Sequence, residues 1–91
     1  MNRPERIAAL DRALAKLRAH AIEVIDAWPP YASQHEAYGV LCEEVAEVFE
    51  EVRKKDLDRY RGRLRAEWIQ VAQVAIRAAA EIEEVNDADS K

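Results

Sequence analysis

The stretch LCEEVAEVFEEV, residues 41–52, decides the fold that the sequence predicts. It holds five glutamates in nine residues beside a regular apolar pattern. At roughly 100° per residue, the glutamates of a helix here share an arc of about 120°. One face can therefore pack, and the other can hold a cation or simply face water. The packing face comprises Leu41, Val45, Val48 and Val52, and the carboxylate face comprises Glu43, Glu44, Glu47, Glu50 and Glu51.

The composition around this stretch indicates one all-α domain over residues 1–91. The chain is 49% hydrophobic and 35% charged, with two glycines and three prolines, which is typical of a helical bundle. A net charge of -4 disfavours a nucleic-acid polymer as partner. We find no signal peptide and no apolar run that could span a bilayer, so we expect a cytoplasmic protein without a membrane partner.

The first helix is predicted over residues 3–27. Asn2 is its expected N-cap, with Glu5 completing a capping box. The helix ends at Trp28, because the proline that follows disfavours helical backbone. Its apolar residues alternate steps of three and four, which is typical of a seam that packs on other helices. The seam comprises Ile7, Leu10, Leu14, Leu17, Ala21 and Val24.

The second helix is predicted over residues 33–55. Ser33 and Glu36 have the spacing of a capping box, with Ser33 as the N-cap. Cys42, the single cysteine, has no partner for an intramolecular disulfide, and we expect it to be packed near the apolar face. Glu51 is expected on the solvated face. Lys54 suits the negative end of the helix dipole.

The third helix is predicted over residues 64–85, after a polar connection (residues 56–65) that bends at Gly62, and before a frayed tail (residues 86–91). Most of this helix is apolar, which is typical of a helix that is buried on most sides. Two other helices cannot cover it, so we expect a three-helix protomer that forms a helical-bundle homo-oligomer. A narrow polar stripe comprises Gln70, Gln73, Arg77, Glu81 and Glu84.

Carboxylates are the main candidates for chemistry. Ser33 is explained as a cap, and His20 and His35 lack the spacing of a zinc site. No glycine-rich phosphate loop is present. Glu44 and Glu47, one helical turn apart, can present two oxygens to Mg²⁺, which prefers oxygen ligands and bridges carboxylates to phosphates. Glu67, at the start of the third helix, is the expected third acid.

These acids match a known pattern. Glu43 and Glu44, then Glu47, and Glu67 after nineteen intervening residues resemble the E-E-x-x-E...E-x-x-D signature of the MazG-like, all-α nucleotide pyrophosphohydrolases. The strings SQHEAYGVLCEEVAE (residues 33–47) and EWIQVAQVAIRAA (residues 67–79) are similar to a small, often phage-associated branch of that superfamily. The resemblance covers roughly residues 33–80.

The resemblance implies an activity, a metal and an assembly. Members of the superfamily hydrolyse nucleoside triphosphates, NTP or dNTP, to a monophosphate and pyrophosphate. They act in house-cleaning or in control of the nucleotide pool. They use Mg²⁺, for which Mn²⁺ is a possible substitute, and assemble as homodimers or dimers of dimers around the site. Glu44, Glu47 and Glu67 would be metal ligands. Glu43 would be a further ligand or would orient the attacking water.

One position departs from the signature. Gln70 stands where the motif has aspartate, and its amide oxygen can coordinate a metal but brings no negative charge. An alternative hypothesis is therefore a catalytically silent helical interaction protein that keeps the family fold.

Candidate substrate residues are aromatic or basic, and each has an ordinary alternative in the core or on a solvated surface. Aromatic side chains can stack on a base, and cationic side chains can bind phosphate. The aromatic set, with one histidine, comprises Trp28, Tyr31, His35, Tyr38 and Trp68. The phosphate-binding candidates are Lys54, Arg61 and Arg77.

Overall fold

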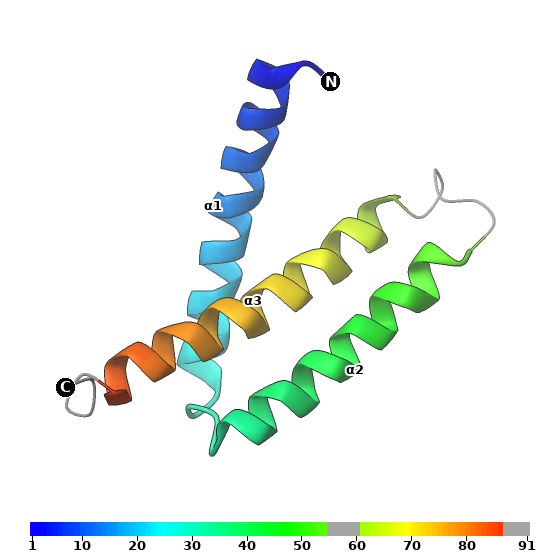
Figure 1. Ribbon diagram of the computed structural model, residues 1–91. Coiled ribbons are helices and arrows are strands. Elements are labelled where there is room, and N and C mark those ends of the chain that lie inside the picture. Colours follow the sequence, from blue (N-terminus) through cyan, green and yellow to red (C-terminus); the bar gives the residue numbers. More distant parts are fainter. Residues whose placement is uncertain (55–60, 87–91) are drawn as a thin grey trace.

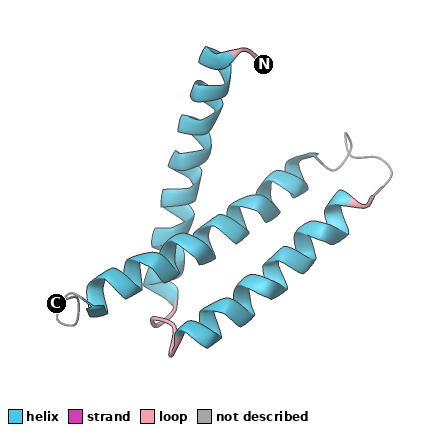
Figure 2. Cartoon of the chain, viewed as in Figure 1, coloured by secondary structure: helices cyan, strands magenta, loops and turns pink. Residues whose placement is uncertain are grey.

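The structure, a computed structural model, describes residues 1–54 and 61–86. It contains α1 (Arg3–Ala27), α2 (Gln34–Val52) and α3 (Arg61–Asn86). Figures 1 and 2 show α2 and α3 lying antiparallel, with α1 crossing α3 and projecting away from the pair at its N-terminal end. Both other helices pack on α3, and the all-α, three-helix prediction is confirmed. None of the described helices meets the length and hydropathy that a bilayer crossing requires.

Helix α1 has the bounds that its sequence signals predict. Asn2 Oδ1 accepts a hydrogen bond from the Glu5 backbone N–H at 2.9 Å, and Glu5 Oε1 accepts one from the Asn2 N–H at 3.2 Å. At the other end, Trp28 has extended backbone ahead of the two prolines. The predicted capping box and the predicted end of the helix are therefore confirmed.

Helix α2 begins as predicted and ends early. Ser33 Oγ accepts from the Glu36 N–H at 3.1 Å, which confirms the N-cap. Glu36 Oε1 accepts from the Ala32 N–H at 3.0 Å, one residue before the position that a capping box specifies. The helix stops at Val52, with Arg53 as its C-cap, whereas residue 55, the predicted end, lies outside the described residues.

Helix α3 begins at Arg61, so Gly62 lies in its first turn and the bend predicted there is wrong. A glycine in a helix costs about 1 kcal/mol relative to alanine. The arginines and leucine around it favour helix, and the helix continues through it. The rest of the predicted connection (residues 56–60) and most of the predicted tail (residues 87–91) lie outside the described residues.

From Gln70 to Glu81, the polar stripe of α3 faces inward. Gln73 and Arg77 are buried beside Val74, the largest fully buried side chain among the described residues. Trp68 is 54% exposed, and Ile76 is exposed as well. The two helices that pack on α3 cover this polar side and Val74, and they leave other apolar residues, such as Trp68 and Ile76, open in the single chain.

Three expectations for α2 are wrong in detail. Glu51 is buried rather than solvated, with only 8% of its surface exposed. Its Oε1 atom lies 3.0 Å from Lys54 Nζ. Cys42 is exposed rather than packed. Val45 and Val52 of the predicted packing face are also exposed. The helix is rotated about its axis relative to the expectation, so that the edge of its carboxylate face meets α3.

The single chain has a large surface for its mass. Its accessible area is 7280 Å², against about 5,400 Å² for a typical folded monomer of 10.4 kDa. Its radius of gyration is 15.4 Å, against about 12 Å for a compact domain of 91 residues. Much of the excess is apolar, because Ile7, Leu10 and Leu14 of the α1 seam are exposed, in contrast to Ala21.

The Ser33 cap provides a test of the fold. Ser33→Ala removes the acceptor for the Glu36 N–H, and we expect the free energy of unfolding to fall by about 1 kcal/mol. Ser33→Asp retains an acceptor and should remain close to wild type. Urea denaturation followed by circular dichroism measures both variants. Equal stability of all three proteins would show that the Ser33 cap does not stabilise α2.

Candidate metal centre

Three predicted acids meet where α2 packs on α3. Glu44 and Glu47 from α2 and Glu67 from α3 each offer one oxygen, and these oxygens lie within 4.8 Å of one another. Glu44 and Glu67 are half-buried, whereas Glu47 is exposed. The fourth predicted acid, Glu43, is exposed and is not part of this group. The antiparallel pairing thus gathers carboxylates that are far apart in the sequence.

The carboxylate cluster, Glu44, Glu47 and Glu67, is electrostatically unfavourable when it is empty. Burial, followed by the neighbouring Glu47, raises the pKa of Glu44 above its ordinary value. Burial and then the contact with Glu47 raise the pKa of Glu67 in the same direction. The Oε2 atoms of Glu44 and Glu67 are buried without a hydrogen-bond partner in the described part of the chain. Such atoms cost free energy unless something pairs with them.

This donor set fits a divalent cation. All three ligating groups are carboxylates, the hard oxygen ligands that Mg²⁺ prefers, and Mg²⁺–oxygen distances of about 2.0–2.1 Å separate two ligands of one ion by at most about 4.2 Å. The observed limit of 4.8 Å is close to that separation. A cation would offset the like charges and pair with the two buried oxygens. Glu44, Glu47 and Glu67 are therefore candidate ligands of one ion.

Gln70, the remaining predicted ligand, has its amide oxygen engaged elsewhere. His20 Nε2 lies 2.6 Å from Gln70 Oε1. Gln73 Nε2 donates to the same oxygen at 3.3 Å. Gln70 thus connects α3 to α1 in this structure, and its role as a metal ligand remains a prediction.

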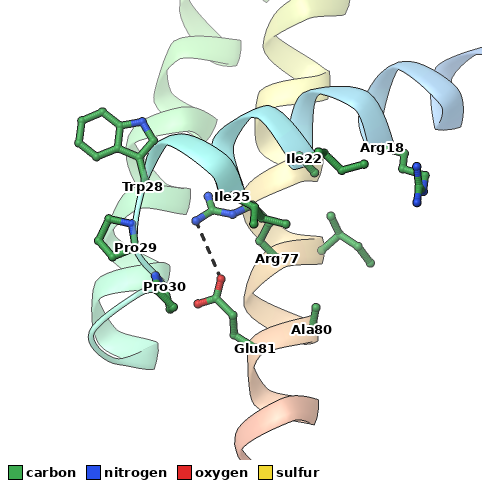
Figure 3. A pocket seen from close by; sticks show the side chains of 11 residues that line it. Arg18, Ile22, Ile25, Trp28, Pro29, Pro30, Arg77, Ala80 and Glu81 are labelled. Carbon is green, nitrogen blue, oxygen red and sulfur yellow. Dashed lines mark ion pairs between the residues drawn. The ribbon is translucent and has the colours of Figure 1, made fainter.

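Arg77 continues this polar chain toward the C-terminus of α3. Its Nη1 donates to Gln73 Oε1 at 3.2 Å and to the Tyr31 hydroxyl at 3.1 Å, and its guanidinium lies 4.6 Å from the centroid of the Tyr31 ring. Its Nη2 is 3.9 Å from Glu81 Oε2, the ion pair drawn in Figure 3. Glu81 Oε1 also accepts from the Tyr31 N–H at 2.8 Å. These contacts hold the α1–α2 connection against α3.

Two cavities flank this chain, and Arg77 lines both. The polar cavity, about 490 Å³, lies between α1, the connection, α2 and α3. Its polar lining residues are His20, Tyr31, Glu36, Gln70, Gln73 and Arg77. The apolar cavity, about 410 Å³, lies between the C-terminal part of α1 and α3 (Figure 3). Its apolar walls include Ile22, Ile25, Trp28, Ile76 and Ala80.

The structure disperses the predicted substrate residues. His35, Tyr38 and Trp68 are exposed and do not line the polar cavity. Lys54 is paired with Glu51, and Arg61 is an exposed residue at the start of α3. The remaining three line the polar cavity: Trp28, Tyr31 and Arg77.

Sequence reasoning missed the role of His20 and Gln73 in this region. The contact between His20 and Gln70 joins residues 50 positions apart, which no local pattern reveals. The sequence did contain one signal of this polar interior. A narrow polar stripe on an otherwise apolar helix, such as that of α3, is as consistent with buried polar contacts as with a solvated edge.

Comparisons with protein-family models, curated proteins and solved structures gave no match.

The raised pKa values predict how stability depends on pH without metal. Between their ordinary and raised pKa values, Glu44 and Glu67 hold protons in the folded chain that the unfolded chain releases. Their contribution to stability therefore declines as pH rises through that window. Glu67→Gln is neutral and nearly isosteric. In buffer with EDTA at pH 7, we expect it to raise the free energy of unfolding by about 1–3 kcal/mol, because it removes a half-buried charge that lies beside other carboxylates.

Urea titrations between pH 4 and pH 8 measure this effect, and Glu50→Gln, at an exposed site outside the cluster, serves as the control. The Glu67→Gln variant should also lose part of the decline in stability with rising pH. A variant less stable than wild type at pH 7 would contradict the electrostatic account of the cluster.

Proposed function

We propose that this chain is a Mg²⁺-dependent nucleoside triphosphate pyrophosphohydrolase of the MazG-like type. It converts an NTP or dNTP to the monophosphate and pyrophosphate, in house-cleaning or control of the nucleotide pool. The observation that carries the proposal is the meeting of Glu44, Glu47 and Glu67, which have the order and spacing of the motif, at one point between two helices.

Each acid has a role in this proposal. Glu44, Glu47 and Glu67 would hold the cation, and Mn²⁺ would fit the same oxygen donors. A cation held there would draw charge from the phosphates and lower the pKa of a water molecule bound to it. Glu43, exposed beside the cluster, orients the attacking water and accepts its proton. Because the pKa values of Glu44 and Glu67 are raised, cation binding is accompanied by proton release as pH falls toward those values.

One observation favours a second candidate, the catalytically silent interaction protein. The oxygen of Gln70 is engaged by His20 and Gln73. Three acids would therefore hold the cation in this chain, whereas the motif provides one further carboxylate at the position of Gln70. A weaker site of this kind would bind metal poorly. Turnover and metal binding separate the two candidates.

The assay uses a panel of standard and modified NTPs and dNTPs with Mg²⁺ or Mn²⁺, and detects pyrophosphate and monophosphate. We expect turnover of at least one substrate, and a loss of about 100-fold or more in Glu47→Gln, because that variant removes a charged ligand. Mg²⁺ should also raise the melting temperature of the wild type by mass action.

Glu50→Gln is the matched control for Glu47→Gln, since Glu50 is an exposed glutamate of the same helix outside the cluster. It should retain both turnover and the effect of Mg²⁺ on melting. Absence of turnover across the panel, together with no effect of Mg²⁺ on melting, would favour the silent interaction protein.

The proposal includes self-association, as a homodimer or a dimer of dimers. The surface excess of the single chain, about 1,900 Å² over a typical monomer, is of the size that a protomer hides in an obligate interface. Exposed aromatic side chains on two helices contribute to it: Phe49 is 60% exposed on α2, and Trp68 is exposed on α3. A second copy of the chain is the partner that would cover these residues.

Light scattering coupled to size exclusion tests this part of the proposal. We expect an oligomer at micromolar concentration, and we expect Phe49→Glu to weaken association at least about tenfold, because it places a charge in an apolar interface. Since Phe49 is exposed in the single chain, circular dichroism should still show the helices. Glu50→Gln again serves as the control. A monomeric wild type would contradict self-association.

A further inference from the structure

The side-chain hydrogen bonds along α3 have a fixed direction. A guanidinium can only donate, so the Gln73 atom 3.2 Å from Arg77 Nη1 is the amide oxygen. The amide nitrogen of Gln73 therefore donates to Gln70 Oε1. His20 Nε2 faces that same oxygen and must also be a donor, which sets the tautomer of the ring. Arg77 thus determines the orientation of both amides.

This direction leaves Gln70 as a donor. An amide oxygen has two lone pairs, and those of Gln70 accept from His20 and Gln73. The hydrogen bonds of Gln70 in the described part of the chain are made by its oxygen. Its amide nitrogen is not one of the buried atoms that lack a partner there, so it is accessible to solvent. The two N–H groups of the Gln70 amide are therefore available to donate hydrogen bonds to a ligand.

The polar cavity beside Gln70 suits an uncharged, planar, hydrogen-bonding group. Its volume of about 490 Å³ is within the range of small-molecule sites, which are mostly apolar with a few polar groups. Trp28 and Tyr31 add aromatic surface, and the Glu36 carboxylate adds an acceptor. Glu81 offsets the charge of Arg77, so the cavity has no surplus positive charge for a phosphate.

The cavity lies next to the carboxylate cluster along both helices. Gln70 follows Glu67 by three residues on α3, and Val40 precedes Glu44 by four residues on α2; Gln70 and Val40 both line the cavity. At a rise of 1.5 Å per residue, these steps are about 4.5–6 Å. The sugar of a nucleotide can cover such a separation between its phosphates and its base.

We infer that the polar cavity holds the base of the nucleotide, with the Gln70 amide donating to a carbonyl or ring nitrogen of the base and Glu36 accepting from a base N–H. Gln70 is then a specificity-determining residue and not a metal ligand. His20, Gln73 and Arg77 are positioning residues that act through it. The inference rests on the proposed function, since it assumes that the phosphates lie at the carboxylate cluster.

The test uses the full chain with Mg²⁺ and the monophosphates of adenosine, guanosine, cytidine and uridine, with ribose 5-phosphate as the probe that lacks a base. Proton–nitrogen NMR spectra follow the side-chain amides of the three glutamines, at positions 34, 70 and 73. At least one monophosphate should shift the Gln70 signals, and ribose 5-phosphate should not. Gln34, at the start of α2 and outside the polar cavity, should be unaffected.

Calorimetry adds two affinities for variants. Gln70→Leu should weaken binding of that monophosphate about tenfold, as expected for a lost hydrogen bond. Its Mn²⁺ affinity, from the electron paramagnetic resonance signal of the free ion, should change less than about twofold, whereas Glu67→Gln should abolish Mn²⁺ binding. Gln34→Leu is the matched control and should change neither quantity.

Gln70 signals that stay unmoved by every monophosphate would overturn the inference, and so would a loss of Mn²⁺ affinity in Gln70→Leu comparable to that in Glu67→Gln. The NMR readout uses the unmodified chain, so the inference stays testable even when Gln70→Leu fails to fold. Hydrolysis of a triphosphate without movement of the Gln70 signals rejects the cavity inference alone. Absence of both hydrolysis and Mn²⁺ binding rejects the proposed function.

Discussion

The inward orientation of the polar stripe of α3, from Gln70 to Glu81, is the constraint on which the rest of the structure depends. A polar group that leaves water must find a partner inside the protein, and Arg77, at 6% exposure, is the most demanding of these groups. Its guanidinium finds the Tyr31 hydroxyl, the Gln73 oxygen and, at longer range, Glu81. These contacts fix the α1–α2 connection. They also orient the side-chain amides of Gln73 and Gln70, which continue the hydrogen-bonded chain to His20 of α1.

The two ends of this polar interior differ in how well their charges are compensated. Near the C-terminal end of α3, the charge of Arg77 is balanced by Glu81, although the Arg77 Nε atom is buried without a hydrogen-bond partner in the described chain. Near its N-terminal end, Glu44 and Glu67 each keep a buried oxygen without a partner in the described chain, and Glu47 adds a like charge. Since folding normally leaves few such groups unpaired, this imbalance is the physical argument for a cation that completes the carboxylate cluster.

Local signals predicted the elements, and tertiary contacts decided which faces meet. The caps at Asn2 and Ser33 depend on neighbours within three residues, so the starts of α1 and α2 followed from the sequence. The spacing of Glu44, Glu47 and Glu67 likewise suggested that these acids meet. The burial of Glu51 and the exposure of Cys42 did not follow, because the apolar pattern of α2 does not specify which edge meets α3. On α3 the apolar side is larger than two helices can cover.

The departure at Gln70 gains a physical meaning from its surroundings. His20 and Gln73 both direct donors at this side chain. A carboxylate here would accept both bonds and bring a negative charge to the metal, but an ionised carboxylate has no N–H or O–H to offer a ligand. The amide accepts the same two bonds and keeps two donors. Within the proposed function, glutamine in place of aspartate therefore removes one negative charge from the metal site and adds hydrogen-bond donors for the base. The residue at this motif position then contacts the nucleotide and not the metal.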